Sequence, residues 1–258
     1  MKKLLLLLIF YLVLSGCHKQ EEDPVMNDAP IINDTNEKDF VLDLDLSAGT
    51  GFEWMVVYQS DNLSIENKGF KVDNGQQAST GGRGNVHFEG SVNDDNDGDL
   101  ILKYARPWEG QGDYKSYHFK VEDNKISDIS CVDSNIYTQM KLINTLGSEK
   151  GYLCTYIPSN WSSEKYESDN EAGIKIIPEN EENGFEIFHF LEKEKLELNN
   201  YEARTIVISA KDYSVYYNGD KLIYMIGPDN NGLRNSITDY NKYFFDFIRT
   251  IDNISFEE

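Results

Sequence analysis

Short segments that alternate apolar and polar residues recur from Phe40 onwards, and they constrain the fold more than any other feature of the chain. Leucine alternates with aspartate over residues 42–46, which is the period of a half-buried strand. The segment 52–58 alternates as well, but Met55 and Val57 make it apolar on both faces, as is typical of a central strand. Further strands are expected over residues 86–92, 100–104 and 117–121. The pattern predicts an all-β sandwich over residues 38–123.

An acidic connection, Asn93 to Asp99, joins two of these strands and invites comparison with a calcium-binding loop. A calcium loop that began at Asn93 would need a bidentate Glu at its twelfth position, which is Tyr104 here. The Asp97-Gly98 pair is instead a turn signal. We therefore expect an acidic turn at this place and no metal site in the chain.

Residues 124–258 form a second expected domain. Asn218-Gly219 predicts a tight hairpin between two of its strands. Apolar residues at helical spacing from Ile237 to Ile251 predict one amphipathic helix, with Ser236 as its N-cap. Strands are expected over residues 151–157, 173–177, 185–190, 203–209, 214–217 and 221–226. An antiparallel sheet with a C-terminal amphipathic helix is an α+β domain.

The N-terminus has the pattern of an exported lipoprotein. Lys2 and Lys3 precede the apolar run 4–14, which is too short to span a bilayer and fits a signal peptide over residues 1–16. The run ends in Leu-Ser-Gly before Cys17, a sequence that resembles the bacterial lipobox, in which the cysteine is diacylated and becomes the new N-terminus. Two acyl chains anchor a protein stably. Residues 17–37 are polar and acidic and are expected to be a flexible tether. The expected location is the outer face of a bacterial membrane.

The net charge of the chain limits the classes of partner that it can bind. The formal net charge of −21 repels phosphate backbones, so nucleic acid is excluded as a partner and membrane attachment must come from lipid.

Beyond Cys17 the chain has two cysteines, Cys131 and Cys154. Export permits a disulfide between them, and buried thiols are the alternative. The chain contains no nucleophile elbow, zinc-peptidase, nucleotide-binding or dinucleotide-binding motif, so we expect neither an enzyme nor a cofactor.

Three segments of the first domain fit neither a strand nor an ordinary turn. Each lies beside an expected strand, so all three could emerge at one end of the sandwich. Glycine lets a backbone approach another surface closely, and a tryptophan beside proline presents a large apolar surface that is already ordered. These are properties of a rigid binding edge. The segments are Ser47-Ala48-Gly49-Thr50-Gly51-Phe52, then Gly81-Gly82-Arg83-Gly84, and then Arg106-Pro107-Trp108.

In order and spacing, the three segments resemble the chagasin family of cysteine-peptidase inhibitors, whose loops carry NPTTG(F/Y)-x-W, GxGG and RPW. The third motif is complete, and Tyr104 and Glu109 beside it are also typical. The second motif has Arg83 where the family has glycine. The first keeps the residues from Thr50 to Phe52 and also Trp54, but Ser47, Ala48 and Gly49 replace the family's Asn, Pro and first Thr. The resemblance covers residues 39–123.

The resemblance implies an immunoglobulin-like sandwich that inhibits papain-like cysteine peptidases. The first loop would lie over the catalytic cysteine without offering a cleavable bond, with Thr50 and Gly51 nearest to it. The flanking loops would grip the cleft walls, and Trp108 would stack on an aromatic wall. The alternative is a non-inhibitory surface lipoprotein that adheres to a partner or assembles a complex; the altered first loop favours this alternative, and the intact third loop opposes it.

Residues 124–258 show a fainter likeness to PsbP-like domains. It rests on the strand from Tyr152, on Pro158 and Trp161, on the Gly173-Ile174 strand and on the closing helix. Such domains share a fold without a shared activity, so the likeness predicts α+β architecture alone.

Overall fold

The computed structural model describes residues 31–32, 38–72, 82–109, 111–134, 140–145 and 148–257. The expected signal peptide, Cys17 and nearly all of the expected tether lie outside these residues. The exception is Ile31–Ile32 (β1), which pairs with the first strand of the sandwich, so the sheet begins within the segment expected as tether. No helix among the described residues has the length and apolar character needed to cross a membrane.

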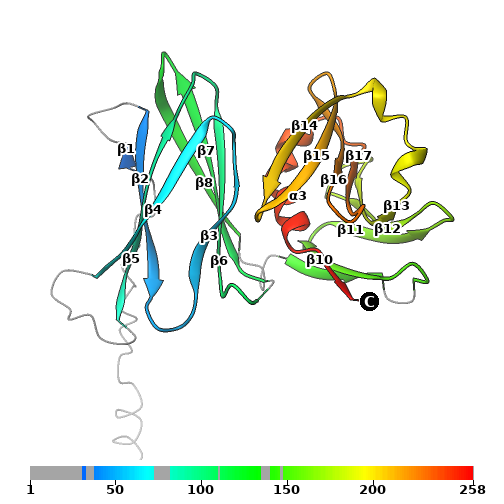
Figure 1. The fold of residues 1–258 in the computed structure, drawn as a ribbon, viewed down its shortest axis with the longest axis horizontal. Coiled ribbons are helices and arrows are strands. Elements are labelled where there is room, and N and C mark those ends of the chain that lie inside the picture. The colour runs from blue at the N-terminus through cyan, green and yellow to red at the C-terminus, as the bar shows by residue number, and fades with distance from the viewer. Residues whose placement is uncertain are drawn as a thin grey trace, which may run out of the picture.

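The N-terminal unit, residues 31–134, is the expected immunoglobulin-like sandwich of two antiparallel four-stranded sheets (Figure 1). The first sheet has the order β1-β2-β5-β4 and the second the order β3-β6-β7-β8. The core between them consists of the alternating residues of both sheets, such as Leu42, Leu44 and Phe88 against Leu100 and Phe119. The strands are β2 (Asp39–Ser47), β3 (Glu53–Gln59), β4 (Leu63–Val72), β5 (Arg83–Val92), β6 (Gly98–Ala105), β7 (Asp113–Glu122) and β8 (Lys125–Ser134).

The sandwich does not end near Asp123 as expected. Asp123 and Asn124 have φ values of 51° and 63°, so they form a tight hairpin, and β8 then pairs with β7 as far as Ser134. A two-residue turn with positive φ at both positions matches the natural twist of paired strands. Among the described residues, the sandwich therefore extends to Ser134.

The C-terminal unit, residues 140–257, is the expected α+β domain. Its larger sheet has seven antiparallel strands in the order β11-β12-β13-β17-β16-β15-β14, and its smaller sheet has the order β18-β10-β9. The strands are β9 (Met140–Asn144), β10 (Tyr152–Pro158), β11 (Ser162–Glu167), β12 (Glu171–Ile177), β13 (Phe185–Leu191), β14 (Glu202–Ile208), β15 (Lys211–Asn218), β16 (Lys221–Ile226), β17 (Gly232–Asn235) and β18 (Ser255–Glu257). The helical elements are α3 (Phe244–Asp252) and the 3-10 turns η1 (Lys193–Lys195), η2 (Leu198–Asn200) and η3 (Tyr240–Tyr243).

The C-terminal helix is shorter than the apolar spacing predicts. Ser236 does not cap it, because its backbone N–H donates to Gly184 O at 3.0 Å and its hydroxyl donates to the same oxygen. Residues 240–243 form η3, and α3 begins only at Phe244. The expected hairpin after β15 is present, with Asn218 paired to Lys221 and Gly219 at a φ of 61°.

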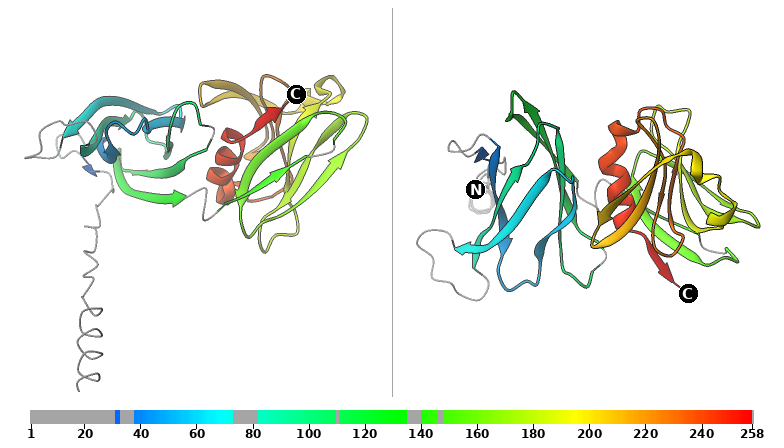
Figure 2. Two further views of the ribbon diagram at one scale, coloured as in Figure 1. Left: turned by 90° about the horizontal axis from the view of Figure 1, so that it is seen from below. Right: turned by 45° about the horizontal axis from the view of Figure 1, so that its top comes forward.

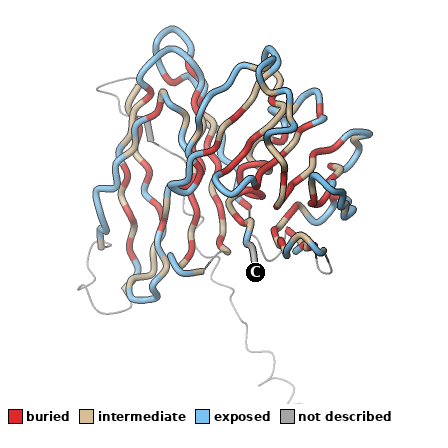
Figure 3. The backbone as a smooth tube through the Cα atoms, turned by 45° about the vertical axis from the view of Figure 1, so that its right-hand side comes forward, coloured by how far each residue is buried: buried red, intermediate tan, exposed pale blue. Residues whose placement is uncertain are grey.

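The two units share a buried junction. In Figure 2, α3 lies on the side of the C-terminal unit that faces the sandwich. Val57, Ile101 and Tyr114 of the sandwich belong to the same buried cluster as Phe247 and Ile248 of α3. Figure 3 shows buried residues, in red, in the strands of both units.

Polar contacts fix the junction as well. Asp252, at the end of α3, accepts hydrogen bonds across the junction from Lys103 Nζ at 2.8 Å and from Tyr114 Oη at 2.5 Å, and within its own unit from Ser209 Oγ. Burial and the Asp252 carboxylate raise the pKa of the Tyr114 hydroxyl well above its ordinary value. The Ser209 backbone N–H donates to Val57 O at 2.9 Å, where β3 has a bulge. These contacts hold the sandwich in one orientation on its neighbour.

Candidate functional site

The first of the three segments connects β2 to β3 and is braced by its own threonine. Thr50 Oγ1 donates to Ser47 O at 2.8 Å and lies 3.4 Å from the Phe52 backbone N–H. Gly49 and Gly51 have φ values of 83° and 80°, which β-branched residues rarely adopt. The glycine that replaces the first threonine of the family motif at position 49 therefore suits this backbone. Gly49, Thr50 and Gly51 are all exposed.

The third segment connects β6 to β7 and is tied to the first by Arg106. Arg106 Nε donates to Thr50 O at 3.0 Å, and Nη1 donates to Glu109 Oε1 at 2.8 Å. The guanidinium also lies 4.6 Å from the centre of the Phe52 ring. The Glu109 backbone N–H closes the turn by donating to Arg106 O at 2.8 Å. One arginine thus fixes the relative position of both segments.

Trp108 is the most exposed large apolar side chain described, at 73%. Its ring lies against Gly51, because a Cβ at position 51 would stand 3.0 Å from Trp108 Cη2. Gly51 is required both for its positive φ and for the space that the indole occupies. The indole is therefore supported on one face by the first segment and open to solvent elsewhere.

The second segment meets the first through the backbone: the Ala48 N–H donates to Gly82 O at 3.0 Å. Arg83 is exposed at the start of β5, while Gly81 lies outside the described residues. Gly84 is buried, because a Cβ there would stand 2.4 Å from Lys71 O. Gly84 thus allows β4 to pair closely with β5, and its expected contact with a partner stays a prediction.

The three segments therefore meet at one end of the sandwich, the lower end in Figure 1. Their exposed crest is Gly49, Thr50, Gly51, Arg83, Pro107 and Trp108. Ser47, Ala48, Phe52, Gly82 and Arg106 are half-buried and support it. We call the three segments the crest loops.

Aromatic side chains beneath the crest loops hold them rigid. Tyr104 lies between Phe52 and Trp54, with ring centres 5.1 and 5.0 Å away. The buried Trp54 donates from Nε1 to Asp45 O at 2.9 Å. The sequence pattern marked Tyr104 and Glu109 as typical neighbours of the third motif but gave them no role. The structure shows that Tyr104 supports the first segment and that Glu109 orients Arg106.

The carboxylates of the acidic turn before β6 are hydrogen-bonded by groups of the turn and of neighbouring segments. Asp94 Oδ1 accepts from Asn62 Nδ2 and from the Asn96 backbone N–H, both at 2.9 Å, and hydrogen bonds from Asn96 lower its pKa. Asp97 Oδ1 accepts from the Val121 N–H at 2.8 Å. No group of three or more potential metal ligands is found in the described part of the chain.

Cys131 and Cys154 are not joined by a disulfide in the structure. Cys131 lies in the exposed strand β8, with Sγ 3.9 Å from Asp133 Oδ1. Cys154 lies in β10 of the other unit, with Sγ 2.8 Å from Ser255 Oγ. The disulfide that export would permit is therefore absent, and the alternative of buried thiols is wrong for Cys131, which is exposed.

Comparison with known protein families found a match for the N-terminal unit. Residues 35–121 match the family model described as Chagasin family peptidase inhibitor I42. The match confirms the resemblance read from the motifs. It covers about a third of the chain and includes all three crest loops. It supports a function as a cysteine-peptidase inhibitor, since this family consists of inhibitors and not of enzymes. No curated protein and no solved structure matches the chain. The PsbP-like character of the C-terminal unit stays a prediction.

Proposed function

We propose that this protein is a surface-anchored inhibitor of papain-like cysteine peptidases and that its three crest loops fill the active-site cleft. One observation carries the proposal: Arg106 ties the first crest loop to the third, so that the exposed Trp108 lies beside Gly51 on a rigid edge. Buried aromatic anchors dominate the energy of such interfaces. Rigid loops lose little entropy when they bind.

A protein inhibitor must resist cleavage by its target, and the first crest loop has the geometry of a poor substrate. A peptidase cleaves an extended strand, whereas Gly49 and Gly51 place left-handed residues on both sides of Thr50. Two hydrogen bonds around Thr50 and the bond from Arg106 to its carbonyl oppose straightening of the segment. We expect Thr50 and Gly51 to approach the catalytic cysteine with no peptide bond in register for attack.

The proposal is tested with soluble protein covering residues 18–258 and a panel of papain-like peptidases acting on a fluorogenic peptide. At least one enzyme should be inhibited reversibly and competitively, and mass spectrometry should find the inhibitor uncut. Serine peptidases should be unaffected, because the crest loops present no substrate-like strand. If micromolar protein inhibits no member of the panel, the non-inhibitory alternative replaces this function.

The anchoring part of the proposal rests on the lipobox-like sequence before Cys17. In bacteria that grow on labelled palmitate, the unsubstituted protein should carry the label in the membrane fraction. Cys17→Ala should be unlabelled and largely absent from acylated membrane material, because the apolar run 4–14 alone anchors poorly. Equal labelling of Cys17→Ala and the unsubstituted protein would contradict the anchor.

A further inference from the structure

One charged residue belongs to the exposed crest, and it is Arg83. The described residues of the crest include no aspartate or glutamate, although the chain has 45 of them. Arg83 stands where the family motif has glycine, so the motif does not account for its side chain. When the crest is covered by a partner, this cation must either stay in water or meet a group of that partner.

The backbone of Arg83 is fixed beside the first crest loop. Arg83 begins β5 and pairs with Ser47 of β2. The Ala48 N–H donates to Gly82 O at 3.0 Å. The second crest loop leads into the sheet β1-β2-β5-β4, the third connects two strands of the sheet β3-β6-β7-β8, and the first crosses from one sheet to the other. Arg83 and Trp108 therefore lie on opposite flanks of the first crest loop.

A second cation, Lys71 of β4, lies beside Arg83 on the same face of its sheet. Lys71 is opposite Asn85 of β5, and Arg83 precedes Asn85 by two residues, so the three side chains share a face. It is the outer face, because the adjacent Val86 belongs to the core. Lys71 and Arg83 are both exposed, and diagonal neighbours of this kind lie roughly 7–8 Å apart. We call them the cation pair.

Neither member of the cation pair is neutralised within the described part of the protein. No ion pair or side-chain hydrogen bond joins Lys71 or Arg83 to a described residue. Asp45 of β2 shares their face and pairs with neither. Six other cations of the sandwich do contact a carboxylate: Lys38, Lys68, Lys103, Arg106, Lys115 and Lys120. An exposed cation left unpaired in a chain of net charge −21 is available to a carboxylate of a partner.

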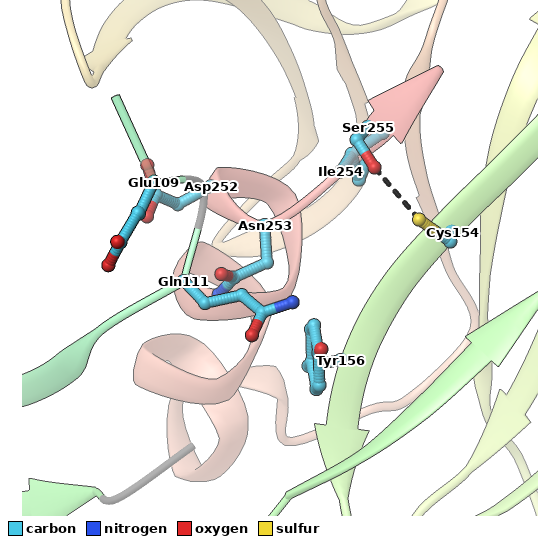
Figure 4. A pocket seen from close by; sticks show the side chains of 8 residues that line it. All are labelled: Glu109, Gln111, Cys154, Tyr156, Asp252, Asn253, Ile254 and Ser255. Carbon is cyan, nitrogen blue, oxygen red and sulfur yellow. Dashed lines mark hydrogen bonds between the residues drawn. The ribbon is translucent and has the colours of Figure 1, made fainter. Parts of the chain in front are cut away.

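The charges on the flank that carries Trp108 are already compensated. Arg106 and Glu109 of the third crest loop pair with each other at 2.8 Å. The pocket beside this loop has a second carboxylate on its wall, that of Asp252 (Figure 4), and Lys103 pairs with it at 2.8 Å. A partner therefore meets an apolar anchor on this flank and an uncompensated positive charge on the other.

We propose that Arg83 pairs with an aspartate or glutamate on the cleft wall of the target peptidase, with Lys71 adding to the attraction; this inference rests on the proposed function. The target then presents a carboxylate on the wall that faces the second crest loop and an apolar surface on the wall that faces Trp108. Charges at the rim of an interface set the association rate and the choice of partner more than the total affinity. Arg83 therefore selects among papain-like peptidases by the charge beside their cleft.

The first test reverses the charge at position 83. Residues 18–258 carrying Arg83→Glu or Arg83→Gln are assayed against a papain-like peptidase that the unsubstituted chain inhibits. Arg83→Glu should raise the inhibition constant at least about tenfold, chiefly through slower association, and Arg83→Gln about threefold, with both effects shrinking as salt rises. Lys175→Glu is the matched control, because Lys175 is exposed on β12 of the other unit and makes no ion pair with a described residue. It should change inhibition less than about twofold, and thermal melting verifies that each variant is folded.

The second test identifies the partner group by chemical crosslinking. A carbodiimide joins a carboxylate to an amine and leaves a guanidinium unreacted. Arg83→Lys protein is treated in complex with the same peptidase, whose catalytic cysteine is replaced by serine. Mass spectrometry should find position 83 joined to an aspartate or glutamate of the peptidase, and the unsubstituted chain should give no crosslink there.

Equal inhibition by Arg83→Glu and Lys175→Glu, or the absence of a crosslink from Arg83→Lys, overturns this inference and leaves the proposed function standing. Absence of inhibition by the unsubstituted chain overturns both.

Discussion

Trp108→Ala tests the proposed binding edge most directly. A tryptophan buries up to roughly 250 Å², and 73% of that surface is exposed here, which leaves roughly 180 Å² for a partner to cover. Full coverage at about 25 cal/mol per Å² would contribute about 4.5 kcal/mol. Coverage of half the surface would contribute about 2 kcal/mol, or a thirtyfold change in affinity. We therefore expect Trp108→Ala to raise the inhibition constant at least thirtyfold.

The fold should survive this substitution, because the indole is exposed and lies against Gly51 rather than in the core. The assay compares the inhibition constant and the melting temperature of each variant with those of the unsubstituted chain. Leu142→Ala is the matched control, since Leu142 is an exposed apolar residue of β9 in the other unit. A less than threefold loss of inhibition in a folded Trp108→Ala protein would refute the argument that this indole anchors the complex.

Two further predictions concern stability. Asp252→Asn should lower the free energy of unfolding by about 3 kcal/mol in urea titrations, because it removes the buried carboxylate that pairs with Lys103. Glu66→Gln, which breaks an exposed pair, should change the free energy of unfolding little, and equal losses in the two variants would contradict this reasoning. Burial raises the folded pKa of Asp99 above its ordinary value of 3.8, so its ionisation costs stability as pH rises through the folded pKa. Asp99→Asn should therefore raise the melting temperature at pH 7 and lose that advantage near pH 3, and a pH-independent difference would count against burial as the cause.

The sandwich was predictable because apolar and polar residues alternate along its core strands, so that one face of each sheet is apolar. Residues 42–46 fill the core with every second side chain, as the period of two requires. Strand β8 escaped prediction because it lies at a sheet edge and buries little besides Ile126 and Ser134. Its sequence therefore carries almost no apolar period, and the preceding Asp123-Asn124 hairpin has the composition of a domain end. Edge strands are the elements that pattern reasoning detects least well.

The crest loops were found by motif, but the way they are held together was not. Spacing indicated that three glycine or tryptophan segments could share one end of the sandwich. It could not show that Arg106 binds a carbonyl of another loop, since a lone arginine in a chain rich in carboxylates has many equivalent partners. The buried position of Gly84 was equally hidden, because a glycine for packing and a glycine for contact look alike in sequence.

The junction explains an anomaly that the sequence displayed and that was interpreted wrongly. The segment around Val57 is apolar on both faces, which favoured a central strand, yet β3 is an edge strand of its sheet. Val57 is buried because the C-terminal unit covers it, and its carbonyl accepts from Ser209 across the junction. In β6, Ile101 and the charged Lys103 are buried on the face turned away from the sandwich core. A half-buried sheet that is apolar on its outer face needs a second layer, and a buried lysine in that face needs a carboxylate from the layer. The C-terminal unit is this second layer, and its Asp252 supplies the carboxylate to Lys103.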